Sequence, residues 1–351
     1  MISECVTAES AHHKPLVSII VPTFNREEHL CWTLADLLSQ DCGDVEILVI
    51  DQSTHHQIQT EQYLASIADK VQHIRLTTAN LPAARNLGVE RSHGHIVAFF
   101  DDDVKLDGAV ISRLIRAYRN PNVWGVSGTV LPSTMTGSSG AVGRSSAEAA
   151  ASAPLVMVDT FYGCCMSFRR ALFEKIGYFD EWIGTQPTAH CEDVEFCLRA
   201  SRSGLRLYRD PTVNVYHPTA SAGGCGNRSS GGEELLYHHL MLGLYCHIKN
   251  PRYPGWAGIL DAMAYMYRGY ILNRGLLSRG LRQNVSRHCL FYRAMMIAAR
   301  AVRENSRTET PNAKLRGSRV AGPMAILGQT KRGDEAPVPC DMTSQDQRQS
   351  Q

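Results

Sequence analysis

The chain has 351 residues, of which 44% are hydrophobic and 20% are charged, so it can bury a core large enough for an enzyme. Its formal net charge of +2 excludes a globally basic nucleic-acid-binding protein, and no nucleic-acid partner is expected. Eleven scattered cysteines without a CxxC pair indicate reduced thiols in a cytoplasmic protein. Residues 1–15 lack the basic start and apolar core of a signal peptide. The sequence also contains no uninterrupted apolar run of about 18 residues, the length that would predict a membrane-spanning helix.

After a flexible leader over residues 1–15, short apolar runs alternate with amphipathic segments. The apolar runs predict strands over residues 16–21, 45–50, 71–76 and 95–100, and the amphipathic segments predict helices over residues 27–39, 57–68 and 82–91. Such alternation is typical of βαβ units with right-handed crossovers. We therefore expect an α/β, Rossmann-like fold with a mostly parallel central sheet flanked by helices.

The middle of the chain has a less regular pattern. We predict a helix over 107–119, a strand over 123–130, a loop over 132–153, a short strand or turn and a helix ending at Gly177 within 161–181, a helix ending at Gly204 within 191–204, and an extended segment over 205–217 with a turn at Asp210–Pro211. The expected domains are a main domain over 16–220, a glycine-rich linker and basic helical appendage over 221–303, and a disordered tail over 304–351.

Three consecutive aspartates, Asp101, Asp102 and Asp103, follow the apolar run at residues 96–100. The carboxyl ends of strands are where open α/β sheets bind ligands. Because three adjacent acids repel one another, a cation is expected among them, and carboxylate ligands suit Mg²⁺ or Mn²⁺, which can hold a diphosphate. The alternative interpretation of these residues is a solvated acidic turn.

Four further features accompany the aspartates in a fixed order. The full set is VSIIVPTFNR (17–26), Asp51 at a strand end, ARNLG (84–88), the aspartates (101–103), and the pair Glu192–Asp193 followed by His217. This ordered set resembles the family 2 glycosyltransferases of GT-A fold, which are inverting enzymes that use nucleotide-sugar donors. The resemblance covers residues 16–220. One departure is Gln52, which stands where the family often has a second acid.

The resemblance implies a metal site at the aspartates. Asp101 and Asp103 match the family's DXD positions and would contact the ribose and a Mn²⁺ or Mg²⁺ ion, with Asp103 the better metal ligand. His217 matches a histidine that often completes the metal sphere, although a histidine on a strand is more often structural. Asp102 would orient the site or face water. A divalent cation there would offset the charge that develops on the leaving diphosphate.

The resemblance also assigns residues to the donor. Asp51 would bind the base, and the turn formed by Pro22, Thr23 and Asn25 would line the nucleoside. Arg85 matches a position near the diphosphate, a role that suits a guanidinium group. The alternatives are an ordinary strand-ending turn for the first motif and a surface ion pair for Arg85. The neighbouring Asn86 is expected to connect loops rather than to touch substrate.

Inversion in one displacement needs a general base that deprotonates the acceptor hydroxyl. Asp193 matches the family's base position, and a helix amino terminus there would lower its pKa. Glu192 is the second candidate, and the alternative role for the pair is helix capping. Gly163, Cys164 and Cys165 match a segment beside the acceptor. A thiol nucleophile is disfavoured, because no base is evident near the cysteines and inversion needs no covalent step.

These assignments predict an inverting glycosyltransferase that moves a sugar from a UDP-, dTDP- or GDP-linked donor to a sugar or lipid-linked acceptor, in bacterial polysaccharide or glycolipid synthesis. One alternative is a nucleotidyltransferase that makes nucleotide sugars, but VPTFNREE (21–28) is not the glycine-rich phosphate loop that such an enzyme would need. The other alternative is a non-catalytic nucleotide-sugar-binding protein. The acids Asp101, Asp103 and Asp193 argue against it.

The appendage is strongly basic. Residues 251–303 contain nine arginines and a single acid, Asp261, interleaved with aromatic residues. This pattern fits helices that rest on an anionic membrane surface, which would place a cytoplasmic enzyme peripherally on the inner face of the cell membrane. A face for an RNA or a partner protein, and a solvated helical cap on the core, are the two alternatives.

Overall fold

The structure is a computed structural model, and it describes residues 16–132, 153–188, 190–217, 233–270 and 281–308. The predictions of a leader at 1–15, of a loop over nearly all of 132–153 and of a glycine-rich linker at 222–232 lie outside these residues. The boundary expected near residue 220 falls in the same part of the chain and remains a prediction.

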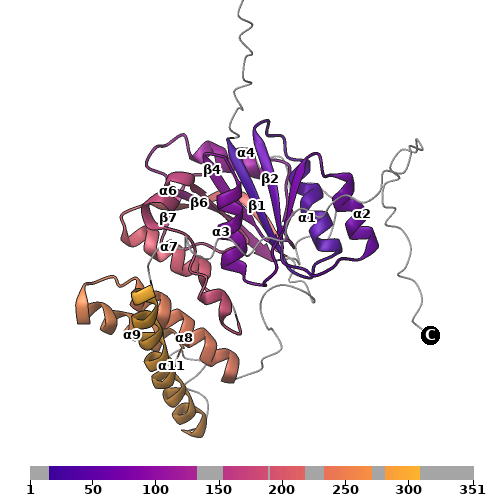
Figure 1. Cartoon of the computed structure of the whole chain (residues 1–351). Coiled ribbons are helices and arrows are strands. Elements are labelled where there is room, and N and C mark those ends of the chain that lie inside the picture. Colours follow the sequence, from indigo (N-terminus) through magenta and orange to yellow (C-terminus); the bar gives the residue numbers. More distant parts are fainter. Residues whose placement is uncertain (1–15, 133–152, 189, 218–232, 271–280, 309–351) are drawn as a thin grey trace, which may run out of the picture. The chain divides into compact units, whose positions relative to one another are not determined.

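Within the described residues, nine strands form one sheet with the order β3-β2-β1-β4-β8-β6-β9-β5, and β7 pairs with β9 (Figure 1). The strands are β1 (Val17–Thr23), β2 (Val45–Asp51), β3 (Val71–Arg75), β4 (Ile96–Phe100), β5 (Lys105–Leu106), β6 (Gly125–Pro132), β7 (Val156–Val158), β8 (Cys165–Arg169) and β9 (Leu207–His217). The helices are α1 (Glu28–Leu38), α2 (Ile58–Ser66), α3 (Leu81–Arg91), α4 (Val110–Ala117), α6 (Arg170–Ile176), α7 (Glu192–Arg202), α8 (Glu233–Lys249), α9 (Gly255–Tyr270) and α11 (Leu281–Thr308), with a short 3-10 helix at Ile183–Thr185.

Helices cover both faces of the sheet. Because alternate residues of a strand point to opposite faces, neighbouring residues of one strand pack in different cores. Ile19 of β1 packs in a core with residues of α1, α2 and α4. Its neighbour Ile20 packs in a second core with residues of α3, α6 and α7. Every residue of β1 and of β4 is buried, as expected for central strands covered on both faces. The predicted α/β fold is confirmed.

The sheet is mixed rather than mostly parallel. The pairs β1–β2, β1–β4, β2–β3 and β6–β9 are parallel, whereas β4–β8, β6–β8, β5–β9 and β7–β9 are antiparallel. The parallel half corresponds to the part of the sequence in which helices alternate with strands and act as crossovers. A strand that is not preceded by such a crossover helix is free to pair in the antiparallel sense.

Three local predictions also need correction. Pro22 does not end the first strand, which continues to Thr23. The turn expected at Asp210–Pro211 is an irregularity inside β9, where the pairing with β6 shifts between Ser127 and Thr129. Residues 304–308, expected to belong to a disordered tail, lie in α11, which runs to Thr308, and the rest of that prediction lies outside the described residues. The helices predicted to end at Gly177 and Gly204 do so, with φ of 78° and 77° at these glycines.

The carboxyl-terminal helices pack in a third hydrophobic core. Leu240, Leu244 and Tyr245 of α8 pack with Phe291 and other residues of α11. The same cluster contains Ile183 and Leu198 of the α/β part of the chain. Helix α8 is therefore packed against α7 as well as against α11.

Candidate active site

The candidate site residues gather where several strands end. Thr23 ends β1 and Asp51 ends β2, and the two residues are paired across neighbouring parallel strands. Asp101, Asp102 and Asp103 directly follow β4, the strand on the other side of β1. The predicted nucleoside and metal positions therefore share the carboxyl edge of the sheet, as expected for an open α/β fold.

Asp101, Asp103 and His217 form a cluster with the donor set of a metal site. Their ligand atoms lie within 4.8 Å of one another. His217 Nε2 is 3.0 Å from Asp103 Oδ1 and 3.7 Å from Asp101 Oδ2. Hydrogen bonds to Asp101 and then to Asp103 raise the pKa of His217 to about 10, so the two carboxylates favour a positive charge at this position. Two carboxylates and an imidazole suit Mn²⁺ or Mg²⁺, with the imidazole favouring Mn²⁺.

Asp102 points away from this cluster into the protein. Thr23 Oγ1 donates a hydrogen bond of 2.6 Å to Asp102 Oδ2, and Arg26 Nε lies 3.3 Å from Asp102 Oδ1. Burial raises the pKa of Asp102 to about 7. Arg26 Nη2 also lies 2.9 Å from Asp103 Oδ2, so one buried arginine holds two of the three adjacent acids. The sequence analysis gave Arg26 no role, although it ends the first motif.

Asp51 is fully buried and has protein partners on both oxygens. His56 Nε2 and His73 Nε2 lie 3.0 Å and 2.9 Å from Asp51 Oδ2, and Ser53 N donates to Oδ1 over 2.8 Å. Burial acts to raise the pKa of Asp51, but the hydrogen bonds from His56 and His73 hold it well below its ordinary value. The predicted contact of Asp51 with a base stays a prediction, and in this arrangement both Asp51 oxygens already have protein partners.

His73 and Arg75 contact the buried Asp51 carboxylate and are themselves partly exposed, with side chains 25% and 31% exposed. Neither residue belonged to a predicted motif. Asn25 is exposed and adopts φ of 52°, with its backbone N–H bonded to Ser53 Oγ. Pro22 and Thr23 are buried in β1, so Asn25 alone of the three predicted nucleoside-lining residues faces solvent.

Gln52 has a structural role at the position where the resemblance leads us to expect a second acid. Its Nε2 donates to the Thr23 carbonyl over 3.3 Å, and its Oε1 accepts from Asn80 N over 2.6 Å. Asn80 in turn caps α3 by accepting from Ala83 N. The amide of Gln52 can donate and accept at once, which a carboxylate could not do, and it thereby ties β1 to the start of α3.

Arg85 is buried rather than placed at a surface. Its side chain is 1% exposed, with Nη1 2.6 Å from Glu192 Oε1 and Nη2 3.4 Å from Asp101 Oδ1. The alternative of a surface ion pair is corrected, whereas the predicted contact of Arg85 with the diphosphate stays a prediction. The guanidinium joins the candidate metal site to the start of α7. The neighbouring Asn86 bonds to the Phe179 backbone through both amide atoms, which confirms its predicted role in connecting loops.

Asp193 is half-buried at the start of α7. Its Oδ2 accepts from Gly163 N over 2.7 Å, and its Oδ1 accepts from Val194 N over 2.8 Å. Burial, followed by the charge of Glu192, raises the pKa of Asp193 to about 7. The prediction that the helix terminus lowers this pKa is wrong, because desolvation and a neighbouring carboxylate outweigh the helix dipole.

The segment predicted to lie beside the acceptor contacts both Arg85 and Asp193. A Cβ on Gly163 would lie 2.8 Å from Arg85 Nη2 and 3.3 Å from Asp193 Oδ2, so the close approach requires glycine. Cys164 and Cys165 are buried, and burial raises the pKa of Cys165 to about 12 and that of Cys164 further above its ordinary value. The thiols are therefore protonated at neutral pH, which disfavours a thiol nucleophile.

A sheet covered by helices on both faces, with an acidic cluster at the carboxyl ends of its strands, is the arrangement expected of the GT-A fold. The sequence profile of Glycosyl transferase family 2 matches residues 18–177. The matched residues extend from β1 to β8 and include the three aspartates, so the similarity to that family covers just under half of the chain.

Curated relatives agree with this assignment. The chain is 25% identical over 219 residues to a glucosyl-dolichyl phosphate glucuronosyltransferase of Haloferax volcanii, covering 57% of this chain and 68% of the relative. It is 30% identical over 105 residues to a GalNAc(5)-diNAcBac-PP-undecaprenol beta-1,3-glucosyltransferase of Campylobacter jejuni, covering 29% of this chain and 34% of the relative. The match thus spans about a third of the second relative's length.

Solved structures support the fold. A mannosyltransferase, PcManGT from Pyrobaculum calidifontis in complex with GDP-Man and Mn²⁺, is similar with a TM-score of 0.54 and 17% identity, covering 82% of this chain and 85% of that chain. S. aureus TarS in complex with UDP-GlcNAc is similar with a TM-score of 0.57 and 18% identity, covering 83% and 82%. Both similarities extend beyond the residues that the family profile matches.

The metal cluster predicts a specific loss of cation binding. Asp103→Asn should weaken Mn²⁺ binding on the order of 10–100-fold or more, because it removes a ligand charge at a nearly unexposed position. Isothermal titration with MnCl₂ alone would measure this. Asp107→Asn is the matched control, since Asp107 pairs with Arg113 at 2.7 Å and is not part of the cluster. Equal affinities of wild type and Asp103→Asn would contradict the assignment.

Proposed function

We propose that the protein is an inverting, metal-dependent glycosyltransferase whose general base is Asp193. One observation carries the proposal: Arg85 lies between the Asp101 carboxylate and the Glu192–Asp193 pair, so a cation site and a candidate base belong to one cluster. A leaving diphosphate needs positive charge, and an attacking hydroxyl needs a base, on opposite sides of one anomeric carbon. This arrangement supports a single displacement, which inverts the configuration.

Asp193 is favoured over Glu192 as the base. Glu192 is 5% exposed and is bound to Arg85 at 2.6 Å, so its carboxylate is committed to an ion pair. Asp193 is half-buried, and the hydrogen bonds it accepts within the described part of the chain come from the backbone N–H groups of Gly163 and Val194. A pKa of about 7 also matches the optimum for a general base that works near neutral pH.

The donor would occupy the carboxyl edge of the sheet. Asp101, Asp103 and His217 would hold Mn²⁺ or Mg²⁺, which supplies charge neutralisation for the diphosphate when bound. The Asn25 turn and the exposed parts of His73 and Arg75 would face the nucleoside. The buried Asp51 carboxylate would hold the His73 ring in place through its contact with Nε2. Structural neighbours were solved with GDP-Man and Mn²⁺ and with UDP-GlcNAc, which supports a GDP- or UDP-linked sugar, while a dTDP-linked sugar is proposed from the sequence resemblance alone.

The acceptor class follows from the curated relatives. Their names specify a glucosyl-dolichyl phosphate and an undecaprenol diphosphate oligosaccharide as the molecules they extend. We therefore propose a lipid-linked sugar as the acceptor of this chain, in bacterial polysaccharide or glycolipid synthesis. Such an acceptor resides in a membrane, so the enzyme would work at the inner face of the cell membrane.

Incubation with UDP-, GDP- and dTDP-sugars plus Mn²⁺ tests the reaction class. Release of nucleoside diphosphate supports sugar transfer or donor hydrolysis, whereas consumption of added pyrophosphate, with release of nucleoside triphosphate and sugar 1-phosphate, would favour a nucleotidyltransferase. Asp193→Asn should lower turnover on the order of 10²–10⁴-fold, because a general base contributes about that much. Binding of the donor should be retained, since Asp193 is not among the cation ligands.

Glu192→Gln distinguishes the two candidate bases. This variant weakens the pairing with Arg85 but leaves the Asp193 carboxylate in place, so we expect a smaller loss of turnover than for Asp193→Asn. Near-normal turnover of Asp193→Asn would exclude Asp193 as the base. Absence of any nucleotide release from every donor, with donor binding intact, would favour a non-catalytic binding protein.

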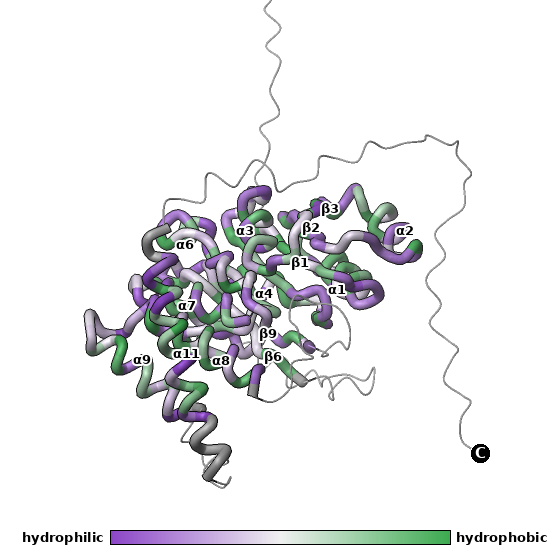
Figure 2. Tube along the Cα trace, turned by 60° about the horizontal axis from the view of Figure 1, so that its bottom comes forward, coloured by the Kyte–Doolittle hydropathy of each residue, from purple (hydrophilic) through white to green (hydrophobic). Residues whose placement is uncertain are grey.

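The basic helices expose large apolar side chains, which supports membrane contact. Trp256 is 80% exposed on α9, and Tyr292 and Met296 are 56% and 66% exposed on α11. Arg293 and Arg300 are exposed on the same side of α11 as Tyr292 and Met296, by their helical spacing. Figure 2 shows hydrophobic and hydrophilic segments alternating along α9 and α11. Among the described helices, none has the length and hydropathy needed to cross a bilayer.

Liposome sedimentation tests this contact. We expect binding to anionic vesicles at low salt and release as salt rises, because each arginine near such a surface contributes about 1 kcal/mol and is screened by ions. Arg293→Gln/Arg300→Gln should weaken binding, whereas Arg91→Gln/Arg119→Gln, which removes two exposed arginines of the α/β part, should not. Equal weakening by both pairs would indicate non-specific attraction, and no binding by the wild type would refute the contact.

A further inference from the structure

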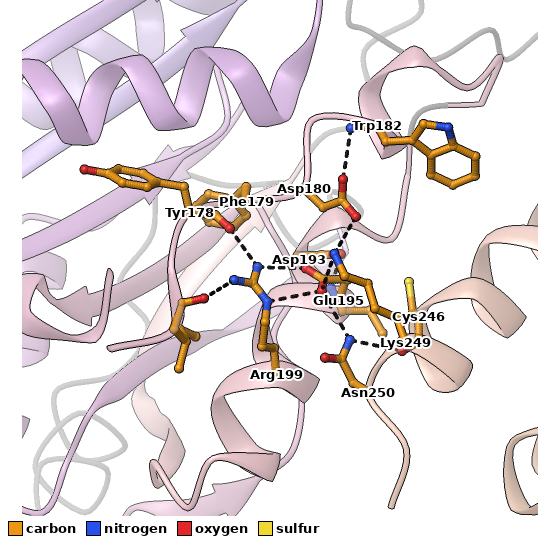
Figure 3. A network of polar contacts seen from close by, with 12 residues as sticks. Tyr178, Phe179, Asp180, Trp182, Asp193, Glu195, Arg199, Cys246, Lys249 and Asn250 are labelled. Carbon is orange, nitrogen blue, oxygen red and sulfur yellow. Dashed lines mark hydrogen bonds and ion pairs between the residues drawn. The ribbon is translucent and has the colours of Figure 1, made fainter. Parts of the chain in front are cut away.

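Buried charges connect α7, which carries Asp193, to α8 (Figure 3). Glu195 lies in the first turn of α7 and is 0% exposed. Its carboxylate is 2.9 Å from Arg199 Nη2, 3.4 Å from Lys249 Nζ and 3.2 Å from Asn250 Nδ2. Lys249 ends α8 and Asn250 follows it, so one end of α8 is fixed to the start of α7.

Lys249 also neutralises a second carboxylate. Its Nζ lies 2.7 Å from Asp180 Oδ2, and Tyr245 OH donates to the same oxygen over 2.5 Å. Burial acts to lower the pKa of Lys249, but Glu195 and Asp180 outweigh it and raise this pKa. The Trp182 N–H donates to the other oxygen of Asp180 over 3.0 Å. The Lys249 ammonium group therefore links the end of α8 both to α7, through Glu195, and to the segment before α7, through Asp180.

A second contact reaches the residue before Glu192. Cys191 is the N-cap of α7 and has φ of 74°, a left-handed conformation that is costly for a residue with a side chain. Its carbonyl accepts from Glu195 N over 2.9 Å, and Cys246 Sγ of α8 lies 3.6 Å from the same oxygen. Helix α8 thus contacts the strained turn on one side of Asp193 and the Glu195 carboxylate on the other.

We propose that Lys249, Asn250 and Cys246 are positioning residues for Asp193, and that α8 is a part of the catalytic unit. These three residues lie outside residues 18–177, which the family profile matches. Small shifts of the first turn of α7 would break the 2.7 Å bond from Gly163 N to Asp193 Oδ2. The inference rests on the proposed function only in giving Asp193 the role of base.

Hydrogen–deuterium exchange tests the positioning without any substrate. Lys249→Met should raise exchange about tenfold or more at the Gly163 amide and in residues 191–196, because the start of α7 opens locally. The peptide over β2 should keep its protection. Arg252→Met is the matched control, since Arg252 carries the same charge three positions away, is exposed and stacks on Tyr253.

Asn250→Ala provides a second variant if Lys249→Met does not fold, because it removes a bond to Glu195 without leaving a buried charge unpaired. For both variants we expect turnover to fall about tenfold while the dissociation constant for donor and Mn²⁺ stays unchanged. Exchange that rises equally in β2, or that does not rise at Gly163, would overturn the inference. Loss of turnover in Asp193→Asn is a separate result, so failure of the positioning and failure of the base assignment can be told apart.

Discussion

The arrangement of the site depends on the buried pairing of Arg85 with Glu192 and on the contact of the same guanidinium with the partly exposed Asp101. These groups come from α3, α7 and the end of β4, which lie far apart in the sequence. Removing one partner of a buried ion pair typically costs about 3–5 kcal/mol, because the other charge stays desolvated. The pairing therefore fixes the distance between the acidic cluster and the start of α7. It also explains why Gly163, which packs against both Arg85 and Asp193, has no room for a side chain.

The charges of the site are balanced in a way that suits a divalent cation. Its five carboxylates, from Asp101, Asp102, Asp103, Glu192 and Asp193, face three cationic groups, from Arg26, Arg85 and His217. If all are ionised, two negative charges remain; a cation bound through His217 would displace the proton of its ring, so the protein would then present three negative charges to the two positive charges of the ion. The pKa values of Asp102 and Asp193 are both raised to about 7, so protonation of these two carboxylates can also reduce the excess of negative charge. Cation binding and protonation are expected to compete in this cluster.

Local patterns were sufficient for part of this account. The short apolar runs predicted β1, β2, β3 and β4, and the order of motifs placed the three aspartates, Asp193 and His217 in one fold. The antiparallel pairing of the later strands was not predicted, because their partners are set by long-range packing rather than by a local crossover. The partners of Arg85 and Asp51, and the raised pKa of Asp193, depend on desolvation in the folded state. The contacts of Lys249 with Asp180 and Glu195 join residues more than fifty positions apart, a separation over which no sequence period operates.

The central claim is that Asp193 is a base held near neutral pKa by burial and by Glu192, against the opposing charge of Arg85. The most direct measurement is the pH dependence of kcat/KM for sugar transfer. A base must be ionised to act, so activity should be high above pH 7 and should fall about tenfold per pH unit below it, with an apparent pKa near 7. A profile that stays flat down to a pH of about 5, as for a carboxylate with an ordinary pKa, would contradict the account.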